Sequence, residues 1–152
     1  MDKKKLLSFL IKARSNTYAG DRGKVKPAFP GSTQLEFKEG SWFYRDFYNL
    51  GNLIFMGLET VYSKGKPVWS MCYYGDFKKM TESEVDKILR TALIIHKDKV
   101  RLWEKVEWQR GQFKYLCTPD FNRGIDEVAG LEEIYKGEDK VYLFYYAGGF
   151  IG

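Results

Sequence analysis

The sequence predicts an α+β domain made of a duplicated αβββ unit, with one curved, mainly antiparallel six-stranded sheet and two helices on one face. The first observation is an internal repeat, because residues 58–77 and 131–150 align without a gap. The second is that each copy contains two runs of β-branched and aromatic residues around a turn with Gly and Lys, which is typical of a β-hairpin. The third is a helical pattern ahead of each copy.

The repeat extends upstream of the two hairpins. Seven residues of the first hairpin recur unchanged in the second, and these are Leu58, Glu59, Tyr62, Val68, Tyr73, Gly75 and Phe77. GSWFY at residues 40–44 resembles GQFKY at residues 111–115, so each copy is expected to begin with a further strand. A chain of 152 residues is then one domain, with an internal repeat of about 40–77 and 111–150.

Both helices have recognisable beginnings. Asp2 is suited to cap a helix whose apolar residues recur at helical spacing through Ala13. Thr81 begins the second helix with a capping box, TESE, in which Glu84 reaches back to the first turn. Each helix therefore carries one apolar stripe and is expected to lie on the sheet.

Residues 17–40 are rich in Gly and Pro and are expected to form an ordered flap packed on the sheet, with a short edge strand at residues 34–37. Its apolar residues Tyr18, Phe29, Leu35 and Phe37 are too many for a disordered segment. The sequence leaves open whether this flap opens over a site or is a fixed cover.

The assumed strand registers divide the first three-stranded unit into two faces, since alternate residues of a strand point to opposite sides. Pairing Tyr48 with Leu53 and Tyr62 with Pro67 gives a core face with Phe43, Arg45, Phe47, Ile54, Met56, Leu58, Thr60, Trp69, Met71 and Tyr73. The other face carries aromatic residues mixed with polar groups. We expect the flap, a partner or a ligand to cover it.

This second face supplies the candidate site, because a concave aromatic surface with a few convergent polar groups is the usual form of a small-molecule site. The candidate ligand-binding residues are Tyr18, Tyr44, Tyr48, Glu59 and Tyr74. The leading hypothesis is a small-molecule-binding or sensor module whose aromatic pocket lies between the sheet and the flap.

An enzyme is the first alternative. Glu59 and Glu132 occupy equivalent positions on largely apolar strands, and either could act as a general acid or base beside a buried tyrosine. The competing structural interpretation pairs each glutamate with a cation. No known catalytic motif is present, so the catalytic residues are unknown.

The composition limits the classes of partner and cofactor that we expect. The net charge is +5, but 25 basic residues are interspersed with 20 acidic ones, so nucleic acid is a weak alternative only. The spacing of Cys72 and Cys117 favours buried reduced thiols, and we expect no metal site and no cofactor. Arg45 on the apolar face is expected to bind a carboxylate or backbone carbonyls, with a structural salt bridge as the leading interpretation and anion binding as the alternative. No long apolar segment is present, which predicts a cytoplasmic protein without membrane contact, while the oligomeric state stays open.

Four segments together resemble a family of uncharacterised bacterial domains known as DUF5680. They are TYAG at residues 17–20, PGSTQLEFKEGSWFYRDFY at 30–48, GLETVYSKGKPVWSMCYYG at 57–75 and YYAGGFIG at 145–152. Members of that family occur alone or behind a helix-turn-helix DNA-binding domain. The resemblance implies a sensor or accessory role in transcriptional regulation and assigns no catalytic residues.

Overall fold

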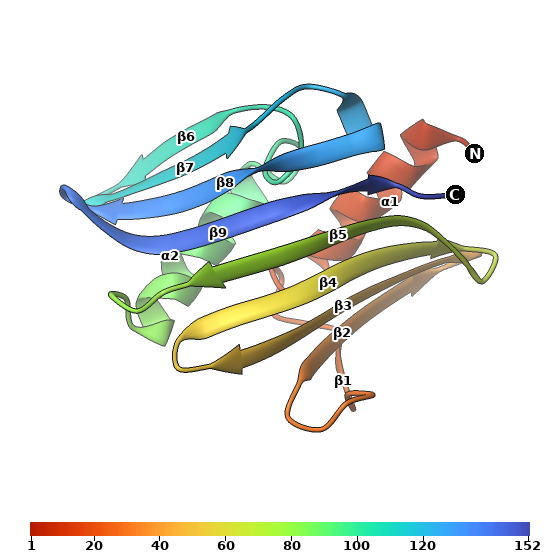
Figure 1. Cartoon of the computed structure of the whole chain (residues 1–152), viewed down its shortest axis with the longest axis horizontal. Coiled ribbons are helices and arrows are strands. Elements are labelled where there is room, and N and C mark those ends of the chain that lie inside the picture. Colours follow the sequence, from red (N-terminus) through yellow and green to blue (C-terminus); the bar gives the residue numbers. More distant parts are fainter.

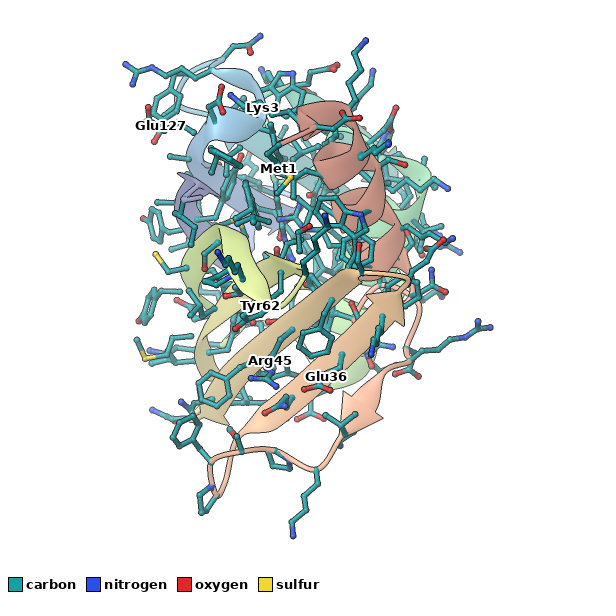
Figure 2. All side chains as sticks on the ribbon, turned by 90° about the vertical axis from the view of Figure 1, so that its right-hand side faces the viewer. Met1, Lys3, Glu36, Arg45, Tyr62 and Glu127 are labelled. Carbon is teal, nitrogen blue, oxygen red and sulfur yellow. The ribbon has the colours of Figure 1, made fainter.

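The computed structural model describes residues 1–152 as one antiparallel sheet with two helices. Both helices, α1 (Lys3–Ser15) and α2 (Glu82–Ile95), lie on the same face of the curved sheet (Figures 1 and 2). This confirms the α+β class and the antiparallel sheet. Neither helix combines the length and the apolar character needed to cross a membrane.

The sheet has nine strands, and the prediction of six was wrong. They are β1 (Lys24–Val25), β2 (Thr33–Glu39), β3 (Trp42–Gly51), β4 (Ile54–Ser63), β5 (Lys66–Asp76), β6 (Val106–Arg110), β7 (Phe113–Pro119), β8 (Glu127–Lys136) and β9 (Asp139–Phe150). A short 3-10 helix, Gly124–Asp126, precedes β8. The spatial order is β1-β2-β3-β4-β5-β9-β8-β7-β6. Five strands, β1–β5, follow α1 and four, β6–β9, follow α2, so neither half is the predicted unit of one helix and three strands.

The predicted flap is mostly part of the sheet. Residues 33–39 form the full strand β2, and residues 24–25 add the edge strand β1. The prediction of a flap lying across the second face was therefore wrong, because backbone pairing with β3 continues the sheet sideways instead. Tyr18, at the beginning of the segment, packs against the core on the helical side of the sheet, as does Phe37 of β2, whose ring lies 5.8 Å from that of Phe9 in α1.

The two halves meet at β5 and β9, which pair antiparallel at the centre of the sheet. In that register Tyr73 pairs with Tyr146, and these two residues are equivalent positions of the repeat. An approximate twofold axis therefore passes between them. Gly57 lies opposite Tyr73 and Gly130 opposite Tyr146, and a Cβ on either glycine would approach the tyrosine hydroxyl to 2.5 and 2.6 Å.

Equivalent bulges occur in both hairpins. The register shifts between Val61 and Tyr62 in the first hairpin and between Ile134 and Tyr135 in the second. Each shift adds one residue to the following strand, so Val68 and Trp69 are both buried. A bulge reverses which residues share a face beyond it.

This bulge explains why the predicted core face was wrong for β3 and β4. The helices cover the face of Tyr44, Asp46 and Glu59, whereas Met56 and Leu58 are exposed on the outer face. For β5 the assignment of Trp69, Met71 and Tyr73 to the core was right. Arg45 lies beside Glu36 on the outer face (Figure 2) and forms an ion pair with it, with Nη2 3.0 Å from Oε1.

Candidate functional site

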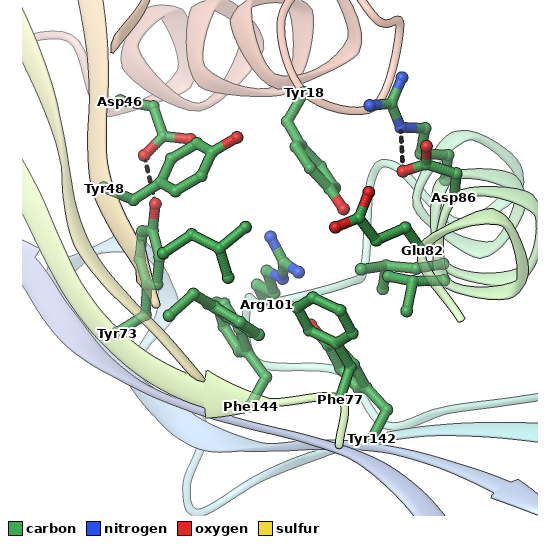
Figure 3. Close-up of a pocket in the computed structure, with 15 residues that line it drawn as sticks. Tyr18, Asp46, Tyr48, Tyr73, Phe77, Glu82, Asp86, Arg101, Tyr142 and Phe144 are labelled. Carbon is green, nitrogen blue, oxygen red and sulfur yellow. Dashed lines mark hydrogen bonds and ion pairs between the residues drawn. The ribbon is translucent and has the colours of Figure 1, made fainter. Parts of the chain in front are cut away.

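A cavity of about 220 Å³ lies between the helical face of the sheet and the first turns of α2. Its wall is mostly apolar and aromatic, and it includes Tyr48 and Leu50 of β3, Phe55 of β4, Tyr73 of β5, and Tyr142 and Phe144 of β9 (Figure 3). Tyr18, Phe77, Val85 and Leu89 complete the apolar part. The charged groups in the wall are Asp46, Glu82, Asp86, Arg90 and Arg101.

Asp46 is a buried carboxyl in this wall, held by the hydroxyl of Tyr73, which donates to its Oδ1 at 2.6 Å. Burial raises the pKa of Asp46 to about 7, and the nearby Glu59 carboxylate acts in the same direction. Arg101 and Arg14 act against that shift. At neutral pH the carboxyl is thus poised between its two protonation states.

Arg101 reaches the cavity from the segment that follows α2. Its Nε and Nη2 donate to both oxygens of Glu132, at 3.0 and 2.8 Å, and its guanidinium lies 3.9 Å from the centre of the Phe144 ring. The backbone of Arg101 has a φ of 56°, a left-handed conformation that costs a non-glycine residue about 1 kcal/mol. The Arg101 amide also donates to the Cys117 sulfur, which fixes the segment.

Glu132 is fully buried and accepts two further hydrogen bonds, from Tyr115 at 2.5 Å and from Tyr142 at 3.0 Å. Burial and the Glu132 charge raise the pKa of both tyrosines, so their hydroxyls stay protonated donors. Glu132 does not line the cavity. The cluster thus holds Arg101 in place from behind.

Glu59 is paired with an arginine of the first helix, through one carboxylate oxygen only. Arg14 of α1 donates to Glu59 Oε2 from Nε at 2.9 Å and from Nη2 at 2.7 Å. Each of the two glutamates is therefore paired with an arginine, as the structural interpretation expected. The arginines belong to the helical layer and not to neighbouring strands.

The structure separates the five predicted ligand-binding residues. Tyr18 and Tyr48 line the cavity. Tyr44 and Glu59 border a narrower space of about 20 Å³ beside it. Tyr74 is on the outer face, because the bulge in the hairpin puts Tyr73, not Tyr74, on the face of Tyr44. The pocket lies under α2 and not under the flap.

Sequence reasoning missed Asp46 and Arg101. A signal existed for Asp46, since it is the acid in the alternating run WFYRDFY and shares the face of Tyr44 and Tyr48. No pattern pointed to Arg101, whose position depends on an irregular segment. Of the two cysteines, Cys117 is buried as expected, whereas Cys72 is exposed.

Comparison with known proteins places the chain in a family but gives no function. Neither a curated protein nor a solved structure matches it. Residues 46–151 match the family described as a domain of unknown function, DUF5680. That span runs from the middle of β3 to the end of β9 and includes the whole of α2, and it covers more than half of the chain. The chain therefore belongs to the DUF5680 family.

Proposed function

We propose that the chain is a small-molecule-binding module whose ligand occupies the cavity between the sheet and α2. The observation that carries this proposal is a largely aromatic cavity of about 220 Å³ with a buried carboxyl, Asp46, and a buried guanidinium, Arg101, in its wall. Ligand sites are typically apolar hollows with a few fixed polar groups. Such a module would serve as a sensor or accessory domain.

The polar groups are fixed before any ligand arrives. Tyr73 orients Asp46, and Glu132 orients Arg101 through two hydrogen bonds. Groups that are already ordered lose little conformational entropy on binding, which favours affinity for a small ligand. Leu50 lies at the rim, where it is about half exposed.

A thermal-shift screen of a metabolite library on the full chain tests the proposal. A ligand at a hundred times its Kd raises the unfolding free energy by about 2.7 kcal/mol. Leu50→Trp should fill the rim and remove the shift, while Met56→Trp, an equally exposed substitution on the outer face, should keep it. A library without any hit, or hits that survive Leu50→Trp, would contradict the proposal.

Acid–base catalysis is a second candidate, favoured by the Asp46–Tyr73 pair in the cavity wall. A carboxyl whose pKa is about 7 can both take and give a proton at neutral pH, which supports general acid–base chemistry. Each ligand from the screen should then be followed by mass spectrometry. Conversion that is lost in Asp46→Asn and kept in Asp139→Asn would establish an enzyme.

Nucleic-acid binding receives less support from the surface. Several basic side chains are paired with carboxylates, including Lys3 with Asp126, Lys12 with Glu39 and Lys114 with Glu107. Paired cations contribute less to phosphate binding than free ones. Retention on DNA that weakens as salt rises would revive this alternative.

A further inference from the structure

The charged groups of the cavity wall contain more unpaired acid than unpaired base. Glu132 neutralises Arg101, and Arg90 is paired with Asp86 at 3.1 Å and with Asp21 at 2.6 Å. Asp46 and Glu82 line the same cavity and have no basic partner within salt-bridge distance. The charges of both arginines are thus offset by carboxylates, although each keeps an unused N–H group, whereas two carboxyl groups have no basic partner.

The second oxygen of Asp46 is the best placed of these available groups. The side chain belongs to a residue only 5% exposed, and Tyr73 donates to Oδ1 alone. Oδ2 has no protein partner and is turned toward the cavity (Figure 3). An ionised carboxylate in such an apolar site is costly unless a cation or donor reaches it.

The rings around the cavity already accept cations on their faces. The Arg101 guanidinium lies over Phe144, and the Arg90 guanidinium lies 4.9 Å from the centre of the Tyr18 ring. Phe55, Tyr73 and Phe144 form a cluster with ring centres 5.1 to 6.3 Å apart. An ammonium group among such rings gains further attraction from their electron-rich faces.

We propose that the ligand of this cavity is a small organic cation, an ammonium group on an apolar body, bound with its N–H groups toward Asp46 and its body among the aromatic rings. This inference rests on the proposed function and adds the ligand class. Arg101 is compatible with it because Glu132 takes Nε and Nη2 and offsets the charge. Nη1 then remains as a donor for a neutral acceptor on the ligand.

The pH dependence of binding follows from the groups around Asp46. Glu59 of β4, Arg14 of α1 and Arg101 influence its charge, and Tyr73 of β5 hydrogen bonds to it. The other titratable groups in the two adjoining spaces are Tyr18, Tyr44, Tyr48, Tyr142, Lys97 and the α2 residues Glu82, Asp86 and Arg90. Since Asp46 has a pKa of about 7, affinity for a cation should rise about tenfold from pH 6 to pH 8.

Three probes of similar shape test the ligand class by calorimetry on the full chain: phenethylamine, phenethyl alcohol and phenylacetate. At pH 8 the amine should bind at least about tenfold more tightly than the alcohol, and phenylacetate most weakly. Asp46→Asn should remove the preference for the amine. Asp139→Asn, which removes a carboxylate from an exposed strand end, should keep it.

The outcomes separate this inference from the proposed function. Tighter binding of the alcohol or of phenylacetate, abolished by Leu50→Trp, would overturn the cation class while the binding module stands. Failure of all three probes together with an empty metabolite screen would overturn both. If Asp46→Asn did not fold, the wild-type affinities at pH 6 and pH 8 would still decide, since an unchanged affinity for the amine contradicts the role of Asp46.

Discussion

The two halves of the sheet share a scaffold and differ in what they place on it. Asp46 and Cys117 occupy equivalent positions opposite Glu59 and Glu132. In the first half the Tyr73 hydroxyl donates to Asp46 beside the cavity. In the second half the equivalent Tyr146 hydroxyl donates to the Leu102 carbonyl at 3.2 Å, and Leu102 is itself buried. One half is thus filled by its own chain, and the other is left with room for a ligand.

The buried ion pairs differ in the same direction. Glu132 accepts four hydrogen bonds, from Arg101, Tyr115 and Tyr142, while Glu59 accepts two, both from Arg14. The positions equivalent to Tyr115 and Tyr142 are Tyr44 and Trp69 in the first half, and Trp69 donates to the Ile125 carbonyl instead. The buried ion pair of the second half is therefore held by more hydrogen bonds than that of the first half.

The largest expected effect is the loss of stability when the glutamate of a buried ion pair is neutralised. Glu132→Gln leaves the Arg101 guanidinium buried without its counter-charge, which should lower the unfolding free energy by about 3–5 kcal/mol. Glu59→Gln should cost less, about 1–3 kcal/mol, because Glu59 accepts two hydrogen bonds where Glu132 accepts four, and because Arg14 also donates to the carbonyls of Val100 and Arg101. Urea denaturation at pH 7 measures both. An equal loss of unfolding free energy in the two variants would contradict the difference between the two ion pairs.

The second effect concerns Asp46, whose replacement by Asn should raise the stability of the protein near neutral pH and not lower it. Because folding raises the pKa of Asp46 from its ordinary value of about 4 to about 7, the folded chain keeps a proton that the unfolded chain has released. The contribution to stability is complete below pH 4 and is lost as the pH rises through 7, a change of roughly 4 kcal/mol. Asp46→Asn removes this loss, although burial of the amide offsets part of the gain.

We therefore expect Asp46→Asn to be more stable than the wild type by about 2–3 kcal/mol at pH 8 and less stable than it by about 1–2 kcal/mol at pH 4, where only the cost of burying the amide remains. Thermal unfolding followed by circular dichroism across this pH range measures the difference, with Asp139→Asn as a matched control that should follow the wild type. A wild-type stability that does not fall between pH 5 and pH 8 would contradict the buried, proton-holding state of Asp46.

The smallest effect compares the two central tyrosines. Tyr73→Phe removes one hydrogen bond, to Asp46, at a cost of about 1 kcal/mol, and Tyr146→Phe removes the bond to the Leu102 carbonyl together with a long contact to the Cys117 sulfur, at a similar cost. Only Tyr73→Phe should change the pH dependence, since its hydroxyl lowers the pKa of Asp46 and its loss moves that pKa upward. Carboxyl NMR shifts of Asp46 would record this change. A similar change in Tyr146→Phe would mean that the halves are electrostatically coupled across β5 and β9.

The fold was predictable where the chain repeats and was not where pairing is irregular. Hairpin patterns, the capping box at Thr81 and the Asp2 cap are local features, and all three are present in the structure. The face assignment failed because one extra residue at Val68 reverses the alternation, and nothing in VYSKGKPVW marks a bulge. The strand β2 was underestimated because Gly and Pro surround it.

The candidate site was predictable only in part, for a related reason. Tyr48 was identified because it alternates with Tyr44 on one face of a strand, and Tyr18 because it is an apolar residue of the segment expected to pack on the sheet; both line the cavity. Arg101 could not be found, since its place depends on a left-handed residue after α2 and on contacts with strands distant in the chain. Position on a strand follows from periodicity, whereas the reach of a loop residue follows from tertiary packing.

The pairing of Tyr73 with Tyr146 has a consequence for the origin of the chain. Equivalent residues that face each other across an axis are what a symmetric homodimer presents, so two separate copies of one helix with four strands could associate in this same register. In a homodimer every substitution appears in both copies, so an acid at the position of Asp46 would be present twice, each time in the same surroundings. Joining the copies in one polypeptide removes that constraint. The single polypeptide instead has Asp46 beside the cavity in one half and the buried Cys117 at the equivalent position of the other.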